Sequence, residues 1–192
     1  MEGNWNNAND EKNKEKINQA ETLMVNTFSE TMDFYGVTPS VGRLYGMMYF
    51  KHQPITLDEM KEALGMSKPS MSTSVRKLQD IGIVQKVWQK GSRKDSFTAE
   101  KNFFNYFSHF FGSKWEREVS MFMTNIKKAQ EQLNKVIEDS ETSEALRERA
   151  ILDYQQLDDA LVYYHWLEKL TKLTKSGEIY HYIPVENIIK ED

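Results

Sequence analysis

The side chains best suited to chemistry in this sequence are small hydroxyls and cations, gathered between residues 67 and 81. Helical spacing places Met71, Val75, Leu78 and Ile81 on one apolar face. The opposite face carries Ser67, Lys68, Ser70, Ser72, Thr73, Arg76 and Lys77. Short hydroxyl side chains let a helix approach a DNA major groove closely, and an arginine can bind guanine through two hydrogen bonds. This stretch therefore predicts a DNA-reading helix, although a merely solvated serine-rich face would have the same composition.

A second group of cations follows at a turn. Lys90, Gly91, Arg93 and Lys94 separate two segments with strand character, residues 83–88 and 95–98. An antiparallel hairpin with a basic tip, placed directly after a recognition-type helix, is the wing of a winged helix-turn-helix. We expect the wing to lie against the DNA backbone or in the minor groove.

The elements that must position these residues are mostly helices. Amphipathic spacing predicts helices from about Ile17 to Tyr35, from Ser40 to Phe50 and from Thr56 or Asp58 to Leu64. Ser67 is expected to cap the reading helix, and Gly82 to end it. From Lys101 onward, two long helices separated by a polar break near residues 139–142 account for most of the chain. The predicted fold is mainly α with a small β-hairpin wing, a winged helix-turn-helix plus long dimerisation helices.

Three regions follow from these elements: a flexible tail over residues 1–16, an N-terminal helix with the winged helix-turn-helix over residues 17–100, and a helical dimerisation and effector region over residues 101–192. The tail is Asn-rich and charged without an apolar run, so neither a signal peptide nor a membrane anchor is expected. We expect a cytoplasmic protein.

Charge is distributed unevenly along the chain. The formal net charge is −4, yet residues 66–101 contain eight basic and three acidic side chains and so carry +5. A basic patch on an acidic body favours contact with phosphate through that patch. We also expect no metal site, no cofactor and no catalytic constellation: cysteine is absent, His52, His109, His165 and His181 are scattered, and no nucleotide or hydrolase motif occurs. An enzyme is not predicted.

Several of these segments resemble one family closely. They are residues 36–46, 56–60, 66–72, 88–95, 115–118 and 176–180, and together they resemble the GbsR-type branch of the MarR-like regulators from about residue 20 to 185. Residues 67–72 and 88–95 are the more specific matches. The resemblance implies a winged-helix homodimer that represses genes for choline uptake and glycine betaine synthesis. It implies a palindromic double-stranded DNA operator and choline, or glycine betaine, as the effector.

The effector expectation rests on aromatic rings. Eight aromatic residues lie between positions 103 and 122, and ring faces attract a quaternary ammonium that cannot donate a conventional hydrogen bond. Rings arranged around such a cation would form an aromatic cage. The residues expected to border this cage are Tyr45, Trp88, Phe104, Phe107, Phe111 and Trp115. Aromatic residues at helical spacing are also ordinary core residues. The sequence therefore leaves open a winged-helix protein that binds DNA without ligand control, and a winged-helix module for protein interaction.

Overall fold

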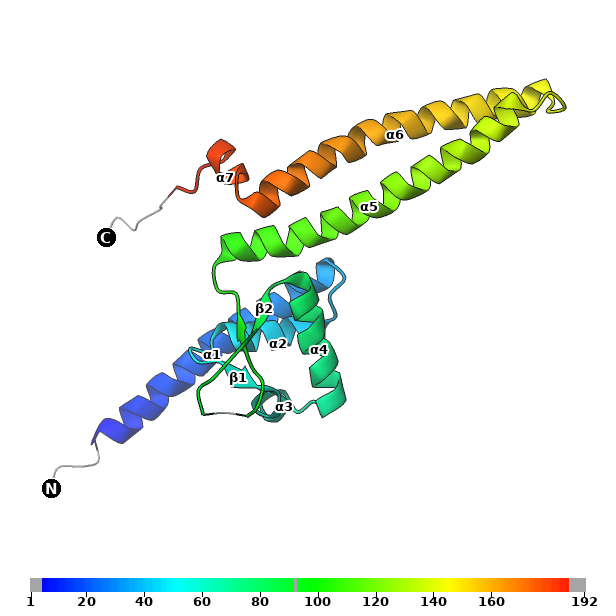
Figure 1. Ribbon diagram of the computed structural model, residues 1–192. Coiled ribbons are helices and arrows are strands. Elements are labelled where there is room, and N and C mark those ends of the chain that lie inside the picture. Colours follow the sequence, from blue (N-terminus) through cyan, green and yellow to red (C-terminus); the bar gives the residue numbers. More distant parts are fainter. Residues whose placement is uncertain (1–4, 92, 187–192) are drawn as a thin grey trace. The chain divides into compact units, whose positions relative to one another are not determined.

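The computed structural model describes residues 5–91 and 93–186. The chain divides into two compact units, Met1–Tyr106 and Phe107–Asp192. Helix α5 (Phe103–Glu138) begins in the first unit and continues into the second (Figure 1).

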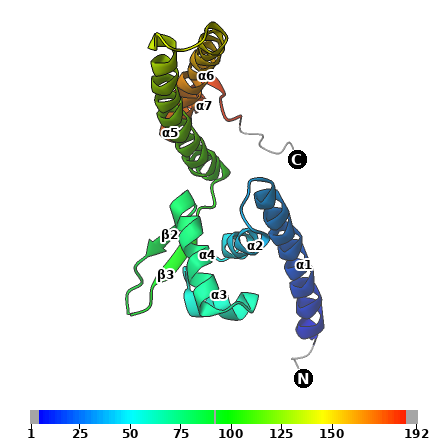
Figure 2. The ribbon, with the colours of Figure 1, turned by 90° about the vertical axis from the view of Figure 1, so that its right-hand side faces the viewer.

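The first unit contains the predicted reading helix and hairpin. Its elements in chain order are α1 (Trp5–Phe34), α2 (Pro39–Tyr49), β1 (Ile55–Thr56), α3 (Leu57–Leu64), α4 (Lys68–Ile81), β2 (Val84–Val87) and β3 (Ser96–Ala99). The strands form an antiparallel sheet in the order β1-β3-β2, with Ile55 opposite Phe97 and Val87 opposite Ser96. Figure 2 shows the β2–β3 hairpin projecting from one side of α3 and α4, away from α1.

Local sequence explains where α3 and α4 begin and end. The Thr56 side chain accepts a hydrogen bond from the Glu59 amide, while the Glu59 carboxylate accepts one from the Thr56 amide, which is a complete capping box. The Ser67 hydroxyl accepts from the Ser70 amide and caps α4 as predicted. Gly65 and Gly82 end the two helices with left-handed backbone angles.

Helices α1 and α2 cross at two glycines. A Cβ atom added at Gly42 would lie 2.9 Å from Ser29 Cα and 3.0 Å from the Phe28 carbonyl oxygen, and one at Gly46 would lie 2.9 Å from Val25 Cα. The Ser29 hydroxyl also donates to the Pro39 carbonyl at 2.9 Å. The two backbones therefore approach so closely that no side chain fits between them.

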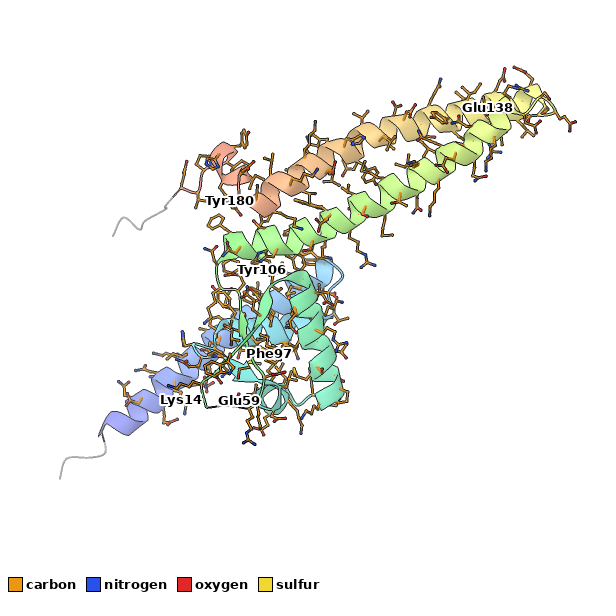
Figure 3. All side chains as sticks on the ribbon, viewed as in Figure 1. Lys14, Glu59, Phe97, Tyr106, Glu138 and Tyr180 are labelled. Atoms are coloured by element: carbon orange, nitrogen blue, oxygen red, sulfur yellow. The ribbon has the colours of Figure 1, made fainter. Side chains whose placement is uncertain are left out.

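A continuous apolar core holds the first unit together. It includes Met32, Leu44, Tyr45, Met48, Met60, Met71, Leu78, Ile83 and Phe97, all nearly or fully buried. Phe97 comes from the central strand and lies inside the unit (Figure 3). The Tyr45 hydroxyl donates to the Glu100 carbonyl at 2.6 Å, so α2 is also tied to the segment that leads into α5.

The second unit is a long antiparallel helical hairpin of α5 and α6 (Glu144–Ser176), followed by the short α7 (Ile179–Tyr182) (Figure 1). Its core contains Val119 and Ile126 from α5 with Tyr164 and Leu167 from α6. Half-buried Trp115, Met123, Leu157, Ala160, Leu161 and Leu170 pack around them.

Polar contacts fasten both ends of this hairpin. At the tip near Glu138, the Arg147 guanidinium donates to the carbonyls of Ile137, Asp139 and Thr142, which satisfies groups left open at the end of α5 (Figure 3). At the opposite end, the hydroxyls of Ser108 and Tyr180 lie 3.1 Å apart. There a Cβ at Gly112 would lie 2.6 Å from Lys175 Cγ, so the Lys175 side chain of α6 packs directly on α5.

Three expectations about the elements differ from the structure. Helix α1 begins at Trp5, so residues 5–16 of the predicted tail are helical, while residues 1–4 lie outside the described residues. The Asn, Asp, Glu and Lys side chains of residues 9–16 give no amphipathic pattern and are exposed, and Gln19 donates to Glu15 one turn away. Strand β1 was missed because two residues carry no periodicity. The unit division after Tyr106 falls slightly beyond the boundary expected at residue 100.

No helix among the described residues is long and apolar enough to cross a membrane. Within the same residues, no three His, Cys, Asp or Glu side chains are grouped as a metal site would require.

The α1–α2 crossing predicts a stability effect. Gly42→Ala is expected to lower the free energy of unfolding by about 1–3 kcal/mol, because the new methyl group meets backbone atoms that cannot move aside. Glu30→Ala, at an exposed position of α1, is the matched control and should change stability by less than about 0.5 kcal/mol. Urea unfolding followed by circular dichroism measures both, and a Gly42→Ala protein as stable as the wild type would contradict the close crossing.

Candidate DNA-reading surface and aromatic cluster

The predicted apolar face of α4 is the face that packs inward. Met71, Val75 and Leu78 are buried and Ile81 is half-buried. Because this side is fixed against the core, the opposite side of the helix points outward. Ser67, Lys68, Ser70, Thr73 and Arg76 are exposed there, and Ser72 and Lys77 are half-buried.

The hydroxyls on this face are not equivalent. Thr73 donates its proton to the Pro69 carbonyl at 3.0 Å, and the Ser67 and Ser70 hydroxyls bond to each other at 2.9 Å. Over residues 5–91 and 93–186, neither Ser72 nor Arg76 has a hydrogen bond or ion pair of its side chain. Ser72 and Arg76 are therefore the side chains of α4 most available to a base edge.

The wing presents its cations to solvent. Lys90, Gly91, Arg93 and Lys94 are exposed around the turn between β2 and β3. At the base of the wing, the Lys86 ammonium pairs with the Asp95 carboxylate at 2.8 Å, across the two strands. The hairpin and the basic tip expected from the sequence are both present.

One acidic residue, Asp58, forms ion pairs with both α4 and the wing. Asp58, in the first turn of α3, contacts the Lys94 ammonium at 2.8 Å and the Lys68 ammonium at 3.5 Å. The hydrogen bond from Lys94 and the charge of Lys68 hold the pKa of the Asp58 carboxyl below its usual value. The sequence suggested Asp58 only as a helix start, because nothing local connects it to Lys94, which lies 36 positions further along the chain.

The six residues expected to border the effector site occupy different surroundings. Phe107, Phe111 and Trp115 form one half-buried cluster on α5, with ring centroids 5.2 Å apart for Phe107–Phe111, 5.8 Å for Phe111–Trp115 and 6.3 Å for Phe107–Trp115. Beside it the Lys114 ammonium lies 5.2 Å from the centre of the Phe110 ring, so a cation already sits on an aromatic face of this helix.

Tyr45, Trp88 and Phe104 belong to the first unit. Trp88 is 80% exposed at the start of the wing loop and Phe104 is 46% exposed. Tyr45 is only 1% exposed, and burial raises the pKa of its hydroxyl. Its ring packs against Phe28 and Tyr106, so Tyr45 is a core residue of the first unit rather than the wall of an open cage.

Three further aromatic residues of α5, Phe103, Tyr106 and Phe110, are divided between the two units. Phe103 stacks on Phe28 with 6.0 Å between centroids, and Tyr106 lies 5.3 Å from Tyr45. Burial raises the pKa of Tyr106 to about 12. Phe110 is fully buried in the second unit. The first turn of α5 thus serves as packing for α1 and α2.

Helix, turn, helix and an antiparallel hairpin with a basic tip define a winged helix, a fold that is common among DNA-binding regulators. A solved structure described as a transcriptional regulator is similar in fold, with a TM-score of 0.52 and 19% identity over 77% of this chain and 99% of its own.

The chain belongs to the GbsR family of transcriptional regulators. It is 49% identical over 88% of its length to the HTH-type transcriptional repressor GbsR of Bacillus subtilis (strain 168), of which it covers 94%. It is 33% identical to the HTH-type transcriptional repressor OpcR of the same organism, over 88% of this chain and 91% of that one. The family model for the GbsR C-terminal helical hairpin matches residues 103–181. The resemblance drawn from the sequence is therefore confirmed, and these relatives are regulators rather than enzymes.

Proposed function

We propose that this protein is a homodimeric transcriptional repressor that binds a palindromic operator and leaves it when choline binds. The observation that carries the proposal is the outward face of α4, which lies beside a basic wing. On this face Arg76 is exposed and Ser72 is half-buried, and neither side chain has a partner among the described residues. The 49% identity to a repressor supports the direction of regulation. The regulated genes would be those for choline uptake and glycine betaine synthesis.

Recognition divides between the two elements. Arg76 reads a base through hydrogen bonds that only guanine accepts in pairs, whereas Arg93 and its neighbours on the wing contact phosphates, which are the same in every sequence. Specificity therefore comes from α4, and much of the affinity comes from the wing.

Two arginine variants test this division. Arg76→Ala is expected to weaken the binding free energy by about 1–3 kcal/mol for the DNA upstream of the protein's own gene. For a scrambled duplex of equal length the loss should be much smaller. Arg93→Ala should weaken binding to both duplexes by the same factor. It should also reduce the slope of log affinity against log salt concentration by about 0.9 per lost phosphate contact. Fluorescence anisotropy at several salt concentrations measures both effects.

Arg149→Ala, on α6 of the second unit, removes the same charge from a residue that belongs to neither α4 nor the wing, and is the matched control. Equal losses on both duplexes for Arg76→Ala would contradict base reading by α4. No binding of the wild-type protein to either duplex at low salt would remove the proposal.

The dimer interface is proposed on the outer face of α6. Val162 is 72% exposed, Tyr163 50% and Trp166 56%, and the Tyr163 and Trp166 rings lie 6.1 Å apart. Several large aromatic and aliphatic side chains exposed next to one another are typical of protein interfaces. A second copy is the partner expected here, because a palindromic operator requires two recognition helices related by twofold symmetry.

A charge placed on this face should separate the subunits. Trp166→Glu is expected to shift the protein from dimer to monomer at micromolar concentration, because a carboxylate would be buried in an apolar contact. Gln132→Glu adds the same charge at an exposed position of α5 and should leave the dimer intact. Analytical ultracentrifugation distinguishes the two, and a dimeric Trp166→Glu protein would place the interface elsewhere.

The aromatic cluster Phe107, Phe111 and Trp115 is the proposed core of the effector site. Each ring can contribute about 0.5–2 kcal/mol to binding a quaternary ammonium, so the three rings together contribute about 1.5–6 kcal/mol, the upper part of which corresponds to millimolar or tighter affinity. Choline can release the operator only by as much as it binds the DNA-free form more tightly than the DNA-bound form.

Calorimetry with choline tests the effector site. Choline should bind and release the operator, while 3,3-dimethylbutan-1-ol, its uncharged isostere, should bind at least tenfold more weakly because ring faces attract the charge. Trp115→Ala should weaken choline binding at least tenfold. Phe122→Ala, a half-exposed ring further along α5, is the control and should not. If calorimetry detects no heat of choline binding and choline does not change operator binding, choline is excluded as the effector.

A further inference from the structure

Asp58 occupies an unusual position on the DNA-reading surface. Its two carboxylate oxygens contact different elements: Oδ2 lies 2.8 Å from the Lys94 ammonium on the wing, and Oδ1 lies 3.5 Å from the Lys68 ammonium at the start of α4. Both lysines are exposed on the two elements, α4 and the wing, that the proposed function places against DNA. One carboxylate therefore holds a member of each DNA-contacting element.

The requirements of helix α3 do not explain this carboxylate. Thr56 and Glu59 already form the complete capping box at the start of α3. Asp58 instead points toward the cations and lines a hollow of about 310 Å³ with Lys68, Arg93 and Lys94. All three of these cations are exposed.

The geometry around Asp58 matches what a DNA phosphate would offer. A phosphate presents anionic oxygens that accept hydrogen bonds from several cations at once, and a carboxylate placed between two ammonium groups offers the same chemistry. Any duplex that approaches Lys68 and Lys94 has to compete with Asp58 for them, or bring its phosphate close to a like charge.

We propose that Asp58 is an internal competitor of the DNA phosphate, which lowers the affinity of this surface for duplexes of every sequence without changing which sequence is read. This inference rests on the proposed DNA-binding function. Asp58 acts through Lys68 and Lys94 and touches no base, so it is a positioning residue. Its effect belongs to the phosphate contacts and leaves the contacts of Arg76 unchanged.

The salt dependence of binding tests the proposal. Asp58→Asn keeps the size of the side chain and removes its charge, so Lys68 and Lys94 lose their ion pairs with this residue and a phosphate no longer competes with it. Binding to the upstream fragment and to a scrambled duplex should tighten several-fold at 50 mM salt, by a similar factor for both. The log–log salt slope should steepen by between about 0.9 and 1.8, for one or two additional phosphate contacts.

Two further variants separate the local contact from general charge. Asp80→Asn removes an equal charge from an exposed residue near the end of α4, and its binding should tighten only slightly, with an unchanged slope. Asp58→Glu retains the carboxylate and should behave like the wild type. Circular dichroism confirms folding, and Asp58→Ser serves as a second neutral variant should Asp58→Asn be unfolded.

The outcomes distinguish this inference from the function on which it rests. If the wild-type protein binds no duplex at low salt, the proposed function itself is contradicted. A wild-type protein that binds, with Asp58→Asn matching Asp80→Asn or binding both duplexes more weakly, overturns the role of Asp58 alone. Tighter binding with a steeper slope for Asp58→Asn, restored to wild-type values by Asp58→Glu, supports it.

Discussion

The burial of one side of α4 is the constraint on which the rest of this structure depends. Met71, Val75 and Leu78 are fixed in a core that α2 and α3 complete, so the rotation of α4 about its own axis is determined. That rotation decides which residues face outward, and it brings Ser72 and Arg76 to the surface together. The close crossing of α1 and α2 at Gly42 and Gly46 supports the same core from behind α2, since a looser crossing would displace α2 and, with it, the surface against which α4 packs.

Residue periodicity predicted much of this arrangement because the relevant signals are local. The apolar spacing of α4, the Ser67 cap, the glycine stops and the basic turn all depend on residues within a few positions of one another, and each is present. The start of α1 was wrong because a polar helix without an amphipathic face resembles a tail in sequence. Two-residue β1 was missed because it exists only through its pairing with β3.

The sequence was less informative about how individual side chains are used. Tyr45 was expected to border a ligand, yet it is enclosed by rings from α1 and α5 that lie far away in the chain. Asp58 gave no sign of its contact with the wing. Both depend on which distant segments meet, and a one-dimensional pattern does not contain that information. The cluster of Phe107, Phe111 and Trp115 was found because its members are one or two turns apart on one helix.

The two ends of the α5–α6 hairpin restrict how this part of the molecule can move. Arg147 binds three carbonyls at the tip, and at the other end the Lys175 side chain of α6 packs on Gly112 and pairs with Glu116 of α5. Sliding one helix lengthwise past the other would break the contacts at both ends. The hairpin should therefore respond to a ligand as a single rigid rod that pivots or rolls, so that a displacement started near the aromatic rings is transmitted along its full length.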